Sequence, residues 1–250
     1  MSLSPLQLVA HRGYAYRYPE NTLLAIQAAV EVGARYIEFD VLMTADEVPV
    51  LFHDRDMLRM CGVPGVIHQH TLAQLQNVNV SESGKFGDSF AENKMTTLNE
   101  IVAYLATVPQ VTAFVELKRQ GLDAHGIDRF LDTVLPLLAP IQQQAVVISY
   151  SIETLLATQQ CSNYPVAAVF DHWEERNNPL IKQLSPEYMF TDINELPLNG
   201  SLSLPGTTLA VYECVDPVKA MQVHERGIEL VETFQIKEML EALNAIKENQ

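Results

Sequence analysis

The chain has 250 residues, enough to bury a substantial core, and its 48% hydrophobic and 19% charged content is typical of a globular protein. Its net charge of −15, from 16 basic against 31 acidic residues, argues against a broad nucleic-acid surface, because phosphate backbones are bound by clustered Lys and Arg. A small anionic ligand held by a few cations in a pocket stays compatible with this charge.

The sequence gives no signal for export or membrane insertion. No apolar run approaches the roughly 20 residues of a membrane helix, and the first expected strand begins near Leu6, which leaves no room for a signal peptide. The three cysteines, Cys61, Cys161 and Cys214, are far apart and in no disulfide or zinc spacing. We therefore expect a cytoplasmic protein with reduced cysteines and no nucleic-acid partner; the oligomeric state stays open.

Short apolar runs with β-branched residues recur along the chain and alternate with helical patterns. A helix is expected over Thr22–Val32, ending at Gly33, and another opens at Asp216-Pro217 and closes at Gly227. This repetition predicts a parallel sheet wrapped by helices. The expected strands are Leu6–Ala10, Tyr36–Met43, Val48–Phe52, Val111–Leu117, Ala145–Ser149, Val166–Phe170, Tyr188–Thr191, Thr208–Tyr212 and Ile228–Glu232.

These are nine expected strands, one more than the eight of a (β/α)8 barrel. The link between Met43 and Val48 is too short for a helical crossover and predicts a hairpin. With a two-residue turn at Asp46-Glu47, His53 would lie opposite Asp40. Val48–Phe52 is then a return strand over the barrel mouth, and eight parallel strands remain. The predicted fold is a single (β/α)8 TIM barrel domain over residues 1–250.

Residues 55–97 do not follow the strand–helix repeat. They are rich in Gly, Pro and Ser, which favour turns, and they form a segment much longer than an ordinary connection between a strand and a helix. Long excursions from a scaffold often form lids or pocket walls. We expect an insertion at about 55–97, after the third, hairpin strand, that forms a small cap over the mouth.

Three acidic residues interrupt the apolar strands. Glu38 and Asp40 are two residues apart and point to one face of their strand, and Glu116 repeats this spacing with Lys118. One such carboxylate would be interpreted as a salt-bridge partner. Three together near the carboxyl ends of successive strands predict oxygen ligation of one divalent cation, Mg²⁺ or Ca²⁺.

Two histidines also end apolar runs. A lone histidine there is usually structural, but His11 and His53 are expected at the same barrel mouth as the carboxylates, where they can serve as general acid and base. Arg12 and Lys118 add the cations that a phosphate needs. This set suits attack on a phosphodiester, by water or by a neighbouring substrate hydroxyl that would give a cyclic phosphate.

The motifs resemble those of the glycerophosphodiester phosphodiesterases, bacterial cytoplasmic type. The matching segments are HRG (11–13), PENT (19–22), GARYIEFDV (33–41), PVLFHD (49–54) and VELK (115–118), in the same order and at similar spacing. The resemblance implies a (β/α)8 barrel with an insertion after the HD motif.

The resemblance also implies roles for individual residues. His11 and His53 would be the acid–base pair, and Arg12 and Lys118 the phosphate contacts. Asn21 of the PENT motif would support the mouth of the site. The metal ligands would be Glu38, Asp40 and Glu116.

The second half of the chain departs from the family pattern. Residues 212–215 read YECV where a W-T-V-N type motif is usual, and Thr233-Phe234 stand where the family has T-D before a proline. Both departures bear on the alcohol-side pocket and hence on substrate preference. Phe86 and Tyr212 are candidates for apolar contacts to a glycerol, with ordinary packing as the alternative.

The sequence thus predicts metal-dependent hydrolysis of glycerophosphodiesters to sn-glycerol 3-phosphate and an alcohol. Two alternatives stay open. One is an enzyme of the same fold acting on lysophospholipid or phosphoinositide headgroups, which the acidic balance disfavours at anionic membranes. The other is a non-catalytic sensor of a glycerophospho-ligand, which would require the loss of a site residue, whereas both histidines and all three carboxylates are present.

Overall fold

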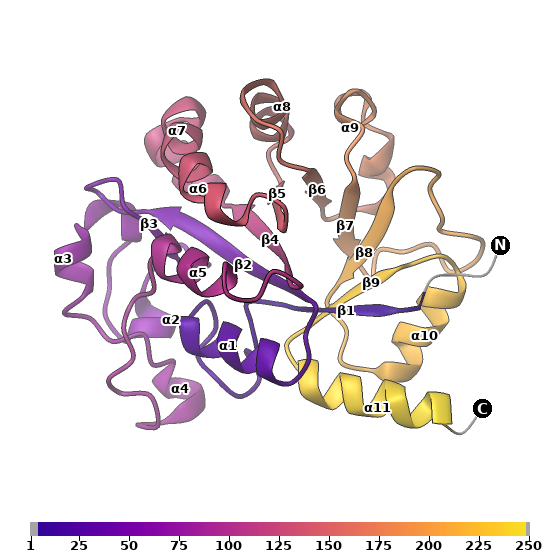
Figure 1. The fold of residues 1–250 in the computed structure, drawn as a ribbon, viewed down its shortest axis with the longest axis horizontal. Helices are drawn as coiled ribbons and strands as arrows, with labels where there is room; N and C mark the ends of the chain where they lie inside the picture. Colours follow the sequence, from indigo (N-terminus) through magenta and orange to yellow (C-terminus); the bar gives the residue numbers. More distant parts are fainter. Residues whose placement is uncertain (1–4, 249–250) are drawn as a thin grey trace.

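A computed structural model describes residues 5–248. Its centre is a closed barrel of eight parallel strands, and the barrel closes because β1 pairs with both β2 and β9 (Figure 1). The predicted (β/α)8 fold is confirmed. The strands are β1 Gln7–Ala10, β2 Tyr36–Met43, β4 Thr112–Leu117, β5 Ala145–Ser149, β6 Val166–Phe170, β7 Tyr188–Asp192, β8 Thr208–Tyr212 and β9 Leu230–Thr233.

Helices surround the barrel, and several begin at side-chain caps that the sequence indicates. The Thr22 hydroxyl accepts a bond from Ala25 N–H at the start of α1, and Asp216 caps α10 in the same way. None of the helices in residues 5–248 is long and apolar enough to cross a membrane. Outside the insertion, the helices are α1 Leu23–Glu31, α5 Leu98–Leu105, α6 Arg119–His125, α7 Ile127–Leu137, α8 Ile152–Cys161, α9 Pro179–Leu184, α10 Pro217–Glu225 and α11 Ile236–Glu248, with 3-10 turns at Ala139–Ile141 and Trp173–Asn177.

The predicted hairpin exists, but its register differs by one residue from the prediction. The antiparallel strand β3 (Pro49–Leu51) pairs Val41 with Leu51, so Phe52 rather than His53 donates its N–H to Asp40 O, at 3.1 Å. The turn holds three residues instead of two, because Glu47 adopts a left-handed conformation at φ 61°. His53 therefore begins the chain segment that leaves the hairpin.

The insertion folds against the hairpin with a hydrophobic cluster of its own. It contains α2 (Leu58–Cys61), a 3-10 turn (Ile67–Gln69), α3 (Leu72–Leu75) and α4 (Ser83–Phe86). In Figure 1 these elements lie on the side of the barrel that carries β2 and β3. Its apolar side chains are buried together with one face of the hairpin, in a cluster of Leu42, Val50, Phe52, Met57, Met60, Ile67, Leu75, Val80 and Met95.

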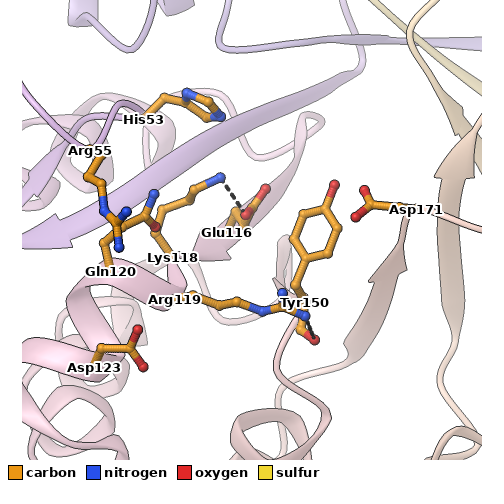
Figure 2. Close-up of a pocket in the computed structure, with 9 residues that line it drawn as sticks. All are labelled: His53, Arg55, Glu116, Lys118, Arg119, Gln120, Asp123, Tyr150 and Asp171. Atoms are coloured by element: carbon orange, nitrogen blue, oxygen red, sulfur yellow. Dashed lines mark hydrogen bonds and ion pairs between the residues drawn. The ribbon is translucent and has the colours of Figure 1, made fainter.

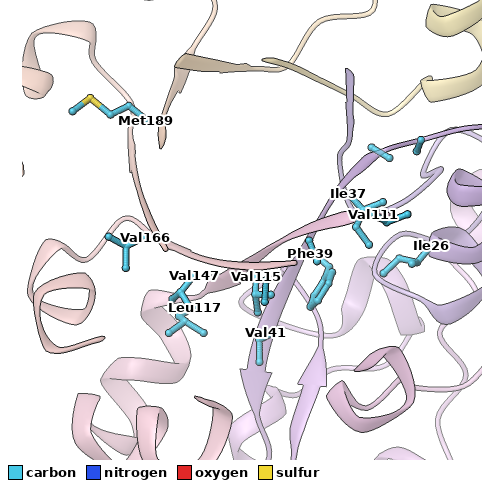
Figure 3. Packing of buried hydrophobic residues seen from close by; sticks show 14 of the residues in the cluster. Ile26, Ile37, Phe39, Val41, Val111, Val115, Leu117, Val147, Val166 and Met189 are labelled. Atoms are coloured by element: carbon cyan, nitrogen blue, oxygen red, sulfur yellow. The ribbon is translucent and has the colours of Figure 1, made fainter. Parts of the chain in front are cut away.

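Alternation along the strands separates an outer apolar layer from the barrel interior. Outward residues of β2 and β4, such as Phe39 and Val115, pack beneath the helices (Figure 3). Inward residues such as Phe114 and Phe190 fill the barrel, with ring centroids 4.9 Å apart. Toward the carboxyl ends of the strands this apolar filling gives way to charged side chains, as is usual for the functional end of such barrels.

Candidate active site

Six of the seven residues predicted for metal, phosphate or acid–base roles line one cavity of about 120 Å³ at the carboxyl ends of the strands. The seventh, Asp40, is buried beneath them and is the register partner of Glu116 on the neighbouring strand. The structure thus brings all of these residues together. The cavity is lined by His11, Arg12, Glu38, His53, Glu116, Lys118, Ile148, Tyr150, Val169, Phe190, Tyr212 and Glu232.

The three predicted carboxylates form a compact group. One oxygen each from Glu38, Asp40 and Glu116 lies within 4.8 Å of the other two. Lys118 Nζ lies 2.8 Å from Glu116 Oε1 and 3.2 Å from Asp40 Oδ1. Burial alone would raise the pKa of Asp40, but Lys118 and then Arg12 outweigh it and hold that pKa well below its usual range. Asp40 is therefore ionised inside the barrel.

Glu38 lacks this compensation. Its Oε2 accepts a bond from Arg12 N–H at 3.1 Å, whereas its Oε1 is buried without a hydrogen-bond partner in the described structure. Burial, reinforced by the neighbouring Asp40, raises the pKa of Glu38 well above its usual range. A carboxylate oxygen left bare in the interior is costly, so this atom marks a place for a cation.

Such a cation would be held by Glu38, Asp40 and Glu116. Their donors are all carboxylate oxygens, the type that Mg²⁺ and Ca²⁺ prefer. The bare Glu38 Oε1 would gain a ligand bond, which is the reason that the group fits. The residues present therefore fit a divalent ion.

Asn21 fixes Asp40 from both sides. Its side-chain Nδ2 donates to Asp40 Oδ2 at 2.7 Å, and its Oδ1 accepts from Asp40 N–H at 3.0 Å. Asn21 adopts a left-handed φ of 54°, which Asn tolerates better than most residues. Arg12 is also left-handed at φ 58°, and Gly13 follows at φ 80°. This strained turn directs both the N–H and the guanidinium of Arg12 toward the carboxylates.

The two histidines approach the cavity with different supports. His53 Nδ1 lies 2.9 Å from Asp54 Oδ1, which favours the tautomer with the proton on Nδ1 and leaves Nε2 to accept. His11 stacks on Phe234 at 4.6 Å and 10°, and its Nδ1 lies 3.5 Å from Glu213 Oε2. Burial, followed by the charge of Arg12, lowers the pKa of His11 well below its usual value.

An ion-pair network connects the insertion to the predicted catalytic groups. Arg59 of α2 pairs with both Asp54 oxygens, at 2.7 and 2.9 Å, and with Glu20 Oε1 at 2.7 Å. Glu20 also accepts from Arg12 Nη1 at 2.9 Å. Through these contacts one side chain of the insertion helps to orient His53 by way of Asp54 and Arg12 by way of Glu20.

Sequence reasoning missed several residues of the site. Glu232 is an inward carboxylate of β9, two residues after the inward Leu230, so the alternation used for Glu38 could have identified it. In the sequence, Glu213 and Phe234 are only departures from the family pattern. The structure places both of them against His11 instead. No local sequence pattern indicates a role for Arg59, because its contacts with Asp54 and Glu20 depend on how the insertion packs against the barrel.

A second, larger cavity of about 500 Å³ adjoins the first (Figure 2). It shares His53, Glu116, Lys118 and Tyr150 with the smaller one. The Tyr150 hydroxyl lies 3.0 Å from the Tyr212 hydroxyl, which lies 3.0 Å from Asp171 Oδ1. Tyr212 lines the smaller cavity and contacts two residues that line the larger one.

Phe86, the other candidate for a glycerol contact, lies elsewhere. It ends α4, where its ring meets Phe90 edge to face at 5.2 Å, and it belongs to the lining of neither cavity.

The fold and the site together define a (β/α)8 barrel with paired histidines and a carboxylate group at the carboxyl ends of its strands. The model of the glycerophosphoryl diester phosphodiesterase family matches residues 11–232. The chain belongs to this family.

Curated relatives carry the same activity in their names. Human glycerophosphodiester phosphodiesterase 1 is 29% identical over 164 residues, which are 66% of this chain and 48% of that protein. The glycerophosphodiester phosphodiesterase of Caldanaerobacter subterraneus is 36% identical over 94 residues, 38% of each chain. The matched region thus spans about half or less of the length of these relatives.

Solved structures share the fold. A phosphodiesterase from Oleispira antarctica, in complex with the product sn-glycerol-3-phosphate, superposes with a TM-score of 0.81 at 20% identity over 97% of both chains. A glycerophosphodiester phosphodiesterase from Thermotoga maritima gives 0.74 at 19% identity, over 96% of this chain and all of that one.

Proposed function

We propose that the chain hydrolyses glycerophosphodiesters to sn-glycerol 3-phosphate and an alcohol, with one divalent cation and with His11 and His53 as the acid–base pair. The observation that carries this proposal is the convergence of two histidines, two cations and the carboxylate group on one small cavity. Family membership supports the reaction class. The product bound to the Oleispira antarctica neighbour supports sn-glycerol 3-phosphate as the phosphate-containing product.

The phosphate would be held by Arg12 and Lys118. The Lys118 ammonium has three donors, and two are directed at Glu116 and Asp40, so one is left for a phosphoryl oxygen. Because Lys118 is only 7% exposed, its charge acts in a medium with little water and is weakly screened. The cation, held by the carboxylates, would stabilise negative charge that develops on the phosphate.

The histidines would move the protons. One imidazole takes a proton from the attacking oxygen, which is either water or a substrate hydroxyl, while the new O–P bond forms. The other imidazole gives a proton to the alcohol oxygen as its bond to phosphorus breaks. Asp54 holds the His53 ring by its Nδ1, and Phe234 holds the His11 ring by stacking.

The test is a coupled assay for sn-glycerol 3-phosphate release, with Mg²⁺, Ca²⁺ or EDTA in the buffer. Glycerophosphocholine and glycerophosphoethanolamine are expected to be hydrolysed with either or both ions and not in EDTA. Turnover of a lysophospholipid alone would favour the rival substrate class, and turnover of nothing under any metal would support a sensor instead. Full activity in EDTA would contradict the metal requirement.

Two further proposals concern organisation and location. We propose that the chain is one barrel domain in which the insertion at about 55–97 caps the mouth; the pairing of Arg59 with Asp54 and Glu20 supports this. We also propose a cytoplasmic location, which fits three cysteines that are all free.

A further inference from the structure

A fourth carboxylate, Glu232, is buried at the same cavity as the predicted metal ligands. It lies on β9, the last strand of the barrel, as the register partner of Val9, and its side chain is inward like that of Leu230. Glu232 is only 3% exposed, and its Oε1 has no hydrogen-bond partner in the described structure. Buried carboxylates are normally paired, so this one calls for a physical reason.

Within the described residues, neither Lys118 nor Arg12 forms an ion pair with Glu232. Lys118 faces Asp40 and Glu116, at 3.2 and 2.8 Å. The Arg12 guanidinium faces Asp40 and Glu20, at 3.3 and 2.9 Å. Among the fully buried carboxylate oxygens of the cavity, Glu38 Oε1 and Glu232 Oε1 are the two without a hydrogen-bond partner in the described part of the chain. The buried carboxyl groups without a full set of partners are therefore on the Glu38–Glu232 side of the cavity.

The spacing of these groups allows one ion to contact both carboxylates. Glu38 and Glu232, together with His11, each offer one ligand atom within 4.8 Å of the others. Oxygens on opposite sides of one Ca²⁺ are at most about 4.6–5.2 Å apart, twice the usual ligand distance. Glu38 also belongs to the group with Asp40 and Glu116, so it lies between the two sets.

We propose that Glu232 is a fourth carboxylate ligand of the divalent cation, which it binds together with Glu38. This inference rests on the proposed function only for the presence of the ion. Four carboxylates favour Ca²⁺, which takes six to eight oxygen ligands in flexible geometry, over Mg²⁺, which is usually bound through one or two carboxylates. Glu232 thereby makes the last strand of the barrel part of the metal site.

The experiment is calorimetric titration of the metal-free protein with Ca²⁺ and with Mg²⁺. Glu232→Gln keeps the shape of the side chain and removes its charge, so the Kd for Ca²⁺ should rise by about 10-fold or more. The matched control is Glu225→Gln, the same change at an exposed position of α10, which should leave the Kd within about twofold. An unchanged Kd in Glu232→Gln would overturn the proposal.

Thermal unfolding supplies a second readout that does not depend on activity. In EDTA, Glu232→Gln should melt at or above the temperature of the parent, because a buried carboxyl group without an ion-pair partner, which destabilises the fold, is gone. With Ca²⁺ added, its Tm should rise less than that of the parent, since ligand stabilisation falls with affinity. A Ca²⁺-induced rise equal to that of the parent would count against ligation.

The two proposals fail in different ways. A parent protein that binds Ca²⁺ through Glu232 yet hydrolyses no phosphodiester contradicts the proposed function alone. A parent that hydrolyses glycerophosphocholine while Glu232→Gln keeps the parental Kd contradicts the role of Glu232 alone. Should Glu232→Gln not fold, Glu232→Asp keeps the charge on a shorter side chain, and a Kd equal to the parental value would then overturn the inference.

Discussion

Replacement of Lys118 by Met tests whether the carboxylates need a counter-charge. Met retains most of the apolar stem and removes the ammonium, which lies 2.8 Å from Glu116 and 3.2 Å from Asp40. Removing one partner of a buried ion pair costs about 3–5 kcal/mol. Since Lys118 is buried and serves two carboxylates, we expect a loss in this range when no metal is present.

The assay is thermal unfolding in EDTA and in saturating Ca²⁺. For a chain of this size, each kcal/mol shifts the Tm by about 2–4 °C, so Lys118→Met should lower the Tm in EDTA by about 6–20 °C. Ca²⁺ should reduce the difference in Tm between Lys118→Met and the parent, because a bound ion supplies positive charge beside the same carboxylates. Lys182→Met, at an exposed position of α9, is the matched control and should change the Tm little. A Tm of Lys118→Met within about 2 °C of the parent in EDTA would refute the electrostatic argument.

Three further predictions concern the histidines, a titrating carboxylate and the first turn. His11→Ala and His53→Ala should each lower turnover at least about 100-fold with the fold retained by circular dichroism, and near-parental turnover would remove that histidine from the mechanism. Burial raises the pKa of Glu213 to about 6, above its unfolded value of 4.5, so the parent loses stability as pH rises through this interval. The side chain of Glu213 is 35% exposed, and solvent screening reduces the effect. In urea unfolding, the free energy of unfolding of Glu213→Gln should therefore rise by about 1 kcal/mol relative to that of the parent between these pH values. A difference between the two proteins that does not change with pH would contradict the pKa shift. Gly13→Ala should cost about 2–4 kcal/mol in the same assay, because φ is 80° and a Cβ would lie 2.7 Å from a carbonyl carbon of α1. Gly200→Ala, also at positive φ but with open space around it, should cost only about 1 kcal/mol, and equal losses would mean that the close contact does not matter.

The barrel could be predicted because strand alternation is a local property. Each apolar run shows its own inward and outward faces, and the short link at residues 44–47 identified the antiparallel hairpin. The predicted register of that hairpin was wrong by one residue, since Glu47 adopts a left-handed conformation and the turn has three residues instead of two. Glu is not a residue that signals such a turn, so the backbone conformation could not be inferred from its identity.

The site was predictable where its residues belong to strands and not where they belong to the insertion. Glu38, Asp40 and Glu116 followed from alternation and from the common end of parallel strands. Arg59 lies in a segment with weak periodicity, and its partners are set by how that segment packs. Glu232 shows the same alternation as Glu38, because it is inward two residues after the inward Leu230, and was predictable on the same ground.

The seam where the barrel closes has a consequence for synthesis of the protein. His11 N–H donates to Thr233 O at 3.1 Å, and the His11 ring rests on Phe234. His11 thus gains these supports only when β9 has been translated and has paired with β1. A chain that ends before β9 carries His11 and His53 but lacks the strand that supports the His11 ring, so the candidate site is complete only when the barrel is closed.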